Sequence, residues 1–302
     1  MRLAVIGLAS SHVDQIVRLA VTGRLGPARI GALIPAEHEP VPAERVEALR
    51  RAVGPRGEDG YDVALVTTRD PATHRALAEP LLRAGVPVFV DKPFVADPAD
   101  AAALVAVAER AGVPLTSSSA LRWHPVVRAA AHQWADGGDG SGRGPATADP
   151  ERTAGLPAAR AASGLALRVS GPVDPGSPHG GRAFLGVHAV EAALGTLALR
   201  GAGLDRSGRG PGAPRVLRVV DDEHRRLVEV ERGGDRVSID LGPRDGWHLV
   251  GPGVDADLPL ADDYLRPGLL GFLDGVARGD RTGPLPGPAL VEAAELLAEV
   301  CR

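Results

Sequence analysis

The first 120 residues alternate between short apolar runs and segments in which apolar positions have helical spacing. Runs typical of buried strands occupy residues 3–8, 29–34, 62–67, 86–90 and 114–118. Helical spacing lies between them, at residues 13–22, 42–53, 72–84 and 98–111. Because apolar strands separated by helices are typical of a parallel sheet covered on both faces, we predict a Rossmann-like domain over residues 1–122.

The rest of the chain has a different pattern and predicts an α+β domain over residues 123–302. Apolar positions indicate strands at residues 215–220, 227–231, 237–241 and 247–250. Helices are predicted at residues 186–199, 264–278 and 288–300, and we expect the last to pack back on the first domain. Residues 136–163 are rich in Gly, Pro, Ala and Ser, which predicts a long loop. The predicted fold class is α/β, with an N-terminal parallel sheet and a second, mostly antiparallel sheet.

Composition excludes several classes of function. The net charge is −4, no Lys/Arg run is present and aromatic residues make up 3% of the chain, so a nucleic-acid partner is not expected. No apolar run approaches the ~20 residues of a membrane helix, so we expect no membrane association. The single cysteine, Cys301, cannot form an internal disulfide, which favours a reducing, cytoplasmic location.

Lys92 is the only lysine among 34 Lys and Arg residues, and asparagine is absent. A bias toward GC-rich codons explains both facts, since a solvated cation can be arginine. A retained lysine therefore indicates a position that needs a compact ammonium group, although one lysine surviving by chance is the alternative. Lys92 lies two residues after the apolar run 86–90, and ligands of parallel sheets bind at the carboxyl ends of the strands.

The first strand leads into Gly7-Leu-Ala9-Ser10-Ser11-His12, where a dinucleotide-binding fold has Gly-x-Gly-x-x-Gly. Only the first glycine is present, and the alternative is an ordinary strand–helix turn. An acid that binds the ribose is expected ~20 residues later. It is missing, with Glu37 the nearest carboxylate after the second strand, so the sequence does not separate NAD from NADP.

Motifs in a fixed order resemble those of the Gfo/Idh/MocA family of oxidoreductases. They are Thr67-Thr68 before Pro71-x-x-His74, Asp91-Lys92-Pro93 in place of Glu-Lys-Pro, Arg122-Trp123 after the last strand of the first domain, and Gly186-x-His188-x-x-Glu191. The resemblance extends over nearly the whole chain, with poor agreement in the central segment. It implies hydride transfer between NAD or NADP and a hydroxyl or carbonyl carbon of a sugar-, polyol- or hydroxy-acid-like substrate.

By the family pattern, Lys92 holds the reacting oxygen and His188 is the acid/base. This agrees with elementary chemistry, because alcohol oxidation requires loss of a proton, and an ammonium group stabilises developing alkoxide charge. The predicted cofactor residues are Gly7, Ala9, Ser10, Ser11, His12, Thr67, Thr68, His74, Asp91, Lys92 and Pro93. The predicted substrate residues are Arg122, His124 and Glu191. No metal site is predicted, since no His-x-x-x-His or His-Glu-x-x-His spacing occurs.

The chain departs from the family at Phe184, where many members carry an aspartate four residues before the histidine. Together with the incomplete glycine motif and the missing ribose acid, this departure leaves two alternatives to the oxidoreductase: a protein with lyase or isomerase chemistry, and a non-catalytic binding protein without cofactor affinity. His188 and Glu191 are also spaced to form a simple helix pair. By resemblance, a homodimer or homotetramer is expected.

Overall fold

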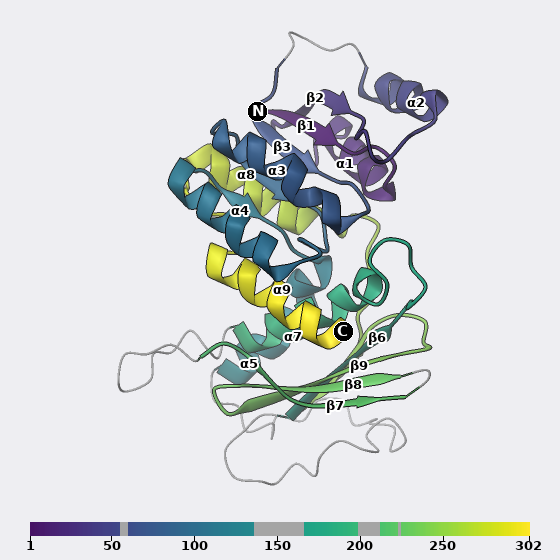
Figure 1. The fold of residues 1–302 in the computed structure, drawn as a ribbon, viewed down its shortest axis with the longest axis vertical. Helices are drawn as coiled ribbons and strands as arrows, with labels where there is room; N and C mark the ends of the chain where they lie inside the picture. The colour runs from purple at the N-terminus through teal and green to yellow at the C-terminus, as the bar shows by residue number, and fades with distance from the viewer. Residues whose placement is uncertain (55–59, 136–165, 199–211, 223–224) are drawn as a thin grey trace. The chain divides into compact units, whose positions relative to one another are not determined.

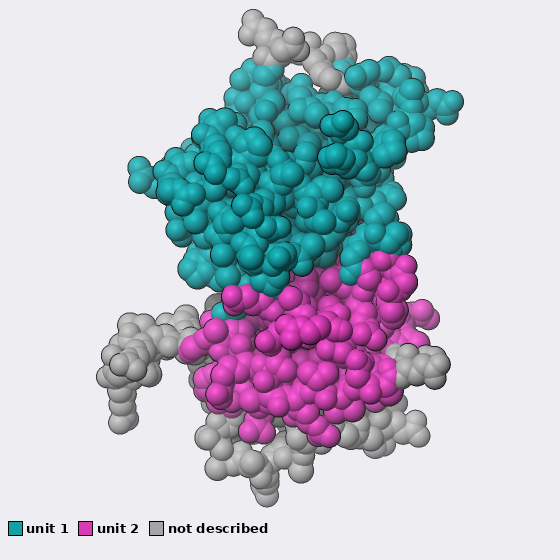
Figure 2. All heavy atoms as spheres, viewed as in Figure 1, with its two compact units in different colours: residues 1–120, 178–180, 260–294 teal, residues 121–177, 181–259, 295–302 magenta. Residues whose placement is uncertain are grey.

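The computed structural model describes residues 1–54, 60–135, 166–198, 212–222 and 225–302, so the predicted loop at 136–163 lies outside the described part of the chain. Contacts divide the chain into two compact units, coloured separately in Figure 2. Unit 1 contains residues 1–120, 178–180 and 260–294, and unit 2 contains residues 121–177, 181–259 and 295–302. The sequence prediction placed residues 260–294 in the second domain, whereas they group with unit 1.

Unit 1 contains a parallel sheet of five strands in the order β2-β1-β3-β4-β5. The strands are β1 (Arg2–Ile6), β2 (Arg29–Ile34), β3 (Val63–Val66), β4 (Val88–Val90) and β5 (Leu115–Thr116). Val5 of β1 pairs with Leu33 of β2 and Leu65 of β3, and all three side chains are buried. The Rossmann-like parallel sheet predicted from the apolar runs is therefore confirmed.

Helices cover both faces of this sheet (Figure 1). They are α1 (Ser11–Val21), α2 (Ala43–Val53), α3 (His74–Arg83), α4 (Pro98–Ala111) and α8 (Arg266–Arg278), with the 3₁₀ turn η1 (Pro71–Thr73) before α3. Side chains of α1, α2 and α8 share one apolar core with the sheet, while α3 and α4 pack together.

Helix α8 belongs to unit 1 because its apolar stripe completes that core. Leu269, Phe272 and Leu273 have the i, i+3, i+4 spacing of one helix face and are all buried. They join Leu3 and Phe89 in the core of the parallel sheet. Burying each side chain of this size contributes about 1.5–3 kcal/mol, which explains how a distant segment is held in unit 1.

Phe272→Ala is expected to lower the free energy of unfolding by about 3–5 kcal/mol, because it removes a fully buried ring. The ring of Phe272 packs against that of Phe89 with centroids 5.9 Å apart. Urea unfolding followed by far-UV circular dichroism measures the change. Val21→Ala, at a half-exposed position of α1, is the control and should unfold like the wild type. Equal stability of both variants would contradict the position of α8 in the core.

Unit 2 contains a six-stranded sheet in the order β11-β10-β6-β9-β8-β7. Its strands are β6 (Ala166–Pro172), β7 (Arg215–Asp221), β8 (Arg226–Arg232), β9 (Asp235–Gly242), β10 (His248–Gly251) and β11 (Val254–Asp257). Strands β6 and β9 are parallel and the other neighbouring strands of the described sheet are antiparallel, which confirms the mostly antiparallel sheet. Among the described residues, no helix has the length and apolar character needed to cross a membrane.

The helices of unit 2 begin with the 3₁₀ turn η2 (Ala120–Trp123), followed by α5 (Pro125–Ala135) and α7 (Ala183–Ala198). Helix α7 packs on β6, β9 and α5. Helix α9 (Gly287–Cys301) closes the chain, its residues divided between the units at 294 and 295. Helix α5 and strands β6 and β11 were not predicted from the sequence, because each offers only a few periodic apolar positions.

Candidate active site

Strand β1 ends in a turn that only glycine fits. Gly7 has φ +90°, and a Cβ atom added there would lie 2.6 Å from Cγ2 of Thr68. The hydroxyl of Thr67 donates to the carbonyl oxygen of Gly7 at 2.6 Å, and both threonine side chains are buried. Thr67 and Thr68, predicted as cofactor residues, therefore hold the β1–α1 turn against the end of β3.

Two arginines hold the turn from outside. The guanidinium of Arg45 donates to the carbonyl oxygens of Leu8 and Ser10 at 2.7 and 3.0 Å, and that of Arg69 donates to Ala9 at 2.5 Å. Ser10 caps α1, its hydroxyl accepting the backbone N–H of His12 at 3.2 Å. A helix N-terminus beside two guanidinium groups suits an anion such as a pyrophosphate. Neither arginine was predicted, since nothing distinguishes them in an arginine-rich chain.

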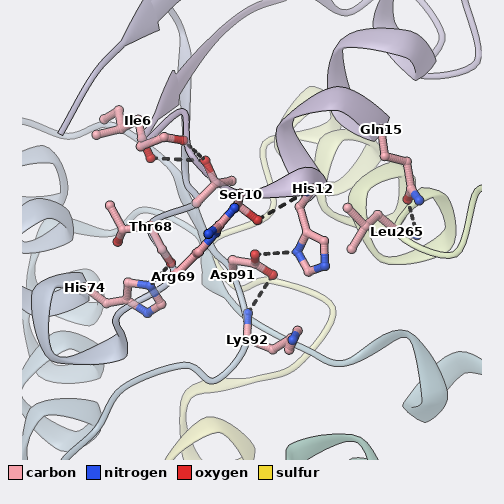
Figure 3. Close-up of polar contacts among 12 residues, drawn as sticks. Ile6, Ser10, His12, Gln15, Thr68, Arg69, His74, Asp91, Lys92 and Leu265 are labelled. Carbon is pink, nitrogen blue, oxygen red and sulfur yellow. Dashed lines mark hydrogen bonds and ion pairs between the residues drawn. The ribbon is translucent and has the colours of Figure 1, made fainter. Parts of the chain in front are cut away.

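Asp91 follows β4 and connects two of the predicted residues (Figure 3). Its Oδ2 accepts from Nδ1 of His12 at 2.5 Å, and its Oδ1 accepts the backbone N–H of Lys92 at 2.7 Å. Burial alone would raise the pKa of Asp91, but the charges and hydrogen bonds of His12 and Lys92 hold that pKa below its ordinary value. His12 stands in the third-glycine position of the motif, so the β1–α1 turn is joined directly to the end of β4.

Lys92 lies at the carboxyl end of the parallel strand β4, as predicted. Its residue surface is 8% exposed, so the single lysine of the chain is not a solvated surface cation. Burial lowers the pKa of Lys92, against the opposing charge of Asp91. The peptide bond to Pro93 is cis. Lys92 thus combines enclosure with a nearby carboxylate, the setting expected of a functional ammonium group.

His74 was predicted as a cofactor residue, but the structure buries it between two backbone segments. It is fully buried, and its ring nitrogens lie 3.0 Å from the carbonyl oxygen of Phe94 and 2.9 Å from that of Thr68. Both ring nitrogens are therefore engaged by the backbone. His74 fastens the loop after β3 to the segment after β4 and presents no ring nitrogen to a ligand.

A cavity of about 200 Å³ lies in unit 1 between the segment after β2 and the loop after β3. Its lining includes His38, Glu39, Thr68, Asp70 and Thr73. One oxygen of Glu39 accepts the backbone N–H of Arg69 at 3.0 Å, while the other is enclosed without a hydrogen-bond partner. Glu37, the carboxylate named from the sequence, is exposed and does not line the cavity. Glu39 was missed because it lies farther along the chain than the usual spacing places the acid.

Unit 2 carries the remaining predicted residues. Arg122 and Glu191 form a buried ion pair, Nη1 to Oε2 at 2.7 Å, with side chains 5% and 7% exposed. His188 is buried on α7, with its ring edge-on to Trp247 at a centroid distance of 4.7 Å. His124 is partly buried, and burial lowers its pKa against a backbone hydrogen bond to Pro259. The two predicted substrate residues Arg122 and Glu191 thus hold one another.

A family model described as "Oxidoreductase family, NAD-binding Rossmann fold" matches residues 47–119. It is the model of the Gfo/Idh/MocA family, and the matched segment includes the Thr-to-His loop and Lys92. The predicted resemblance to the Gfo/Idh/MocA oxidoreductases is confirmed. The low identities to other known proteins fit a divergent member of this family.

Among curated relatives, a D-apiose dehydrogenase of Paraburkholderia graminis is 38% identical over 92 residues, which cover 30% of this chain and 24% of that protein. Among solved structures, the WlbA (WbpB) dehydrogenase of Thermus thermophilus in complex with NAD and UDP-GlcNAcA has a TM-score of 0.64 at 16% identity, covering 100% of this chain and 95% of that one. A putative myo-inositol dehydrogenase of Sinorhizobium meliloti has a TM-score of 0.65 at 16% identity, covering 98% and 95%. These Gfo/Idh/MocA-like structures share the fold over both units.

The residues of unit 1 fit the nicotinamide dinucleotide that the Gfo/Idh/MocA Rossmann fold binds. The β1–α1 turn approaches β3 so closely that a Cβ atom at Gly7 has no room. The enclosed oxygen of Glu39 without a partner is a position where a ligand hydroxyl would supply the missing donor. Gly7, Ala9 and Ser10 would therefore face the pyrophosphate, and Glu39 the ribose.

Proposed function

We propose that this protein is an NAD-dependent oxidoreductase that transfers a hydride between nicotinamide and a hydroxyl or carbonyl carbon of a small polar molecule. The observation that carries the proposal is the enclosure of Lys92 at the carboxyl end of β4, in the same unit as a turn that fits a dinucleotide. Sugars, polyols and hydroxy acids are the proposed substrate class. The dehydrogenase names of the relatives support this choice.

Lys92 supplies the main electrostatic contribution in this proposal. Its ammonium group donates to the reacting oxygen and stabilises the negative charge that develops there as the carbon–hydrogen bond breaks. Enclosure strengthens this interaction, because less water competes for the ammonium group. NAD, when bound, would supply the hydride acceptor. The family pattern assigns the acid/base role to His188.

The preference for NAD over NADP is proposed from Glu39. A carboxylate accepts hydrogen bonds from ribose hydroxyls, and its negative charge disfavours the 2′-phosphate of NADP. The second oxygen of Glu39 has the enclosure and the vacant acceptor capacity for this contact.

Glu39→Gln is expected to raise the Kd for NADH about tenfold or more, because a hydrogen bond to a charged acceptor contributes about 1.5–3 kcal/mol. Glu37→Gln is the matched control, since that neighbouring carboxylate is exposed. Isothermal titration of both variants with NADH and NADPH measures the effect. Unchanged NADH affinity in Glu39→Gln, or tighter NADPH than NADH binding by the wild type, would refute the role of Glu39.

The decisive experiment is a titration of the purified protein with NAD(H) and NADP(H), together with chromatographic analysis of nicotinamide that copurifies. We expect NADH binding, followed by turnover of at least one member of a sugar, polyol and hydroxy-acid panel. No binding at millimolar cofactor would refute the oxidoreductase.

Non-redox chemistry on the same fold, or binding without catalysis, is the second candidate. Phe184 at the family's aspartate position and the mutual pairing of Arg122 with Glu191 favour it, since neither arrangement presents a carboxylate to substrate. NADH binding without any redox turnover, combined with a change in a substrate that leaves its oxidation state unaltered, would favour the lyase or isomerase alternative.

A further inference from the structure

We propose that His12, oriented by Asp91, is the general base that takes the hydroxyl proton in unit 1, beside Lys92. This inference rests on the proposed function and deepens it, since it assigns to a residue of unit 1 the proton transfer that the family pattern gives to His188. No motif of the sequence assigns a proton-transfer role to position 12, where a glycine is expected.

The orientation of His12 follows from its hydrogen bond. Asp91 is buried, and its hydrogen bonds hold it as a carboxylate, which only accepts. The proton between the two groups therefore belongs to Nδ1 of His12, and in the neutral ring, the form that acts as a base, Nε2 carries the lone pair. Figure 3 shows Nε2 on the side of the ring away from Asp91. A carboxylate that fixes the tautomer of a histidine and stabilises its protonated form is the arrangement that activates catalytic bases.

Among the described residues around His12, Nδ1 is the ring nitrogen that is hydrogen-bonded, and Nε2 is not. The titratable groups that contact the ring are Asp91 after β4 and Tyr264 before α8, and Lys92 is bonded through its backbone N–H to the same Asp91. Tyr264 contacts the ring edge-on, with centroids 5.6 Å apart. Burial, reinforced by the charge of Asp91, raises the pKa of Tyr264 to about 12, so this phenol stays neutral near pH 7 and does not compete as a base.

The proposed step balances as an alcohol oxidation. The carbon–hydrogen bond breaks with its electron pair leaving as hydride to bound NAD⁺, so the substrate is oxidised and NAD⁺ is reduced to NADH. The oxygen–hydrogen bond breaks with its proton passing to Nε2 of His12, while Lys92 stabilises the oxygen. The resulting imidazolium donates to Asp91 through Nδ1 and later releases the proton to water.

Asp91→Asn tests the orientation with almost no change of shape. The Oδ1 position is fixed by the backbone N–H of Lys92, so the amide oxygen of the asparagine takes this place and its NH₂ group faces His12. Nδ1 must then accept, and the proton moves to Nε2. We expect the tautomer to switch and kcat to fall about 10²–10⁴-fold. Long-range ¹H–¹⁵N correlation spectra of histidine-labelled protein report the tautomer without any substrate.

His12→Asn removes the proposed base and still provides a hydrogen-bond donor for the carboxylate of Asp91. The asparagine NH₂ group occupies the position of Nδ1 and retains the hydrogen bond, while Nε2 is lost. We expect kcat to fall at least about 100-fold and an ionisation to disappear from the pH profile of kcat/KM, with the Kd for NADH changed less than threefold. Tyr264→Phe keeps the ring contact and is the control for the histidine spectra, in which the tautomer should not change.

The outcomes distinguish the inference from the proposed function. A wild-type ring protonated at Nε2, or an unchanged tautomer in Asp91→Asn, overturns the inference even where NAD-dependent turnover is found. A His12→Asn variant that loses NADH affinity while keeping the pH profile makes His12 a cofactor contact and also overturns it. Absence of NAD(H) binding or of turnover by the wild type refutes the proposed function, and the inference falls with it.

Discussion

Lys92→Arg is expected to lower kcat at least about 10²–10³-fold while leaving the fold intact. Arginine keeps the positive charge but replaces a compact ammonium group by a planar, bulkier guanidinium. Burial lowers the pKa of Lys92, and arginine cannot follow this shift because its pKa stays above ~12. The effect should therefore appear in turnover, whereas far-UV circular dichroism should match the wild type.

The chain offers a matched control for this substitution. Arg83, with a side chain 62% exposed and paired with Glu79 on α3, becomes lysine in Arg83→Lys. If position 92 alone needs lysine, the reverse exchange at position 83 should change neither turnover nor thermal stability. Near-normal turnover in Lys92→Arg, measured on a substrate that the wild type oxidises, would show that Lys92 does not act on the reacting oxygen.

The parallel sheet was predictable because its strands are short, mostly apolar and bounded by strong signals. The second strand has the predicted bounds, residues 29–34, and β3 is buried at every position. Strand β6 was missed because it follows a Gly- and Pro-rich stretch and alternates apolar Leu167 and Val169 with polar Arg168 and Ser170 over few residues. Local pattern therefore identified the mostly apolar strands better than β6, in which polar side chains are buried beside apolar ones.

The site was predictable in position but not in its pairings. Residues that follow parallel strands share one edge of the sheet, since chain order and strand direction determine that edge. The hydrogen bond between His12 and Asp91 joins residues 79 positions apart, and the ion pair between Arg122 and Glu191 joins residues 69 positions apart. No periodicity within one segment encodes such partners, so charged residues predicted to face ligands are instead found facing one another.

The buried ion pair between Arg122 and Glu191 leads to a second prediction with a large expected effect. Arg122→Met is expected to lower the free energy of unfolding by about 3–5 kcal/mol, because it leaves the buried carboxylate of Glu191 without its counter-charge. The double variant Arg122→Met/Glu191→Leu removes both charges and should be more stable than the single variant, close to the wild type. The three tryptophans, Trp123, Trp134 and Trp247, all belong to unit 2, so urea unfolding followed by their fluorescence reports this unit.

An exposed pair provides the comparison that separates burial from charge. Arg215 on β7 pairs with Glu231 at 2.9 Å, but its side chain is 72% exposed, so Arg215→Met should unfold like the wild type. A single Arg122→Met variant as stable as the wild type would contradict the buried pair. A double variant with full stability but reduced turnover would show that Arg122 or Glu191 also acts on substrate, as their sequence positions first suggested. The two charges are therefore tested for stability and for catalysis with the same proteins.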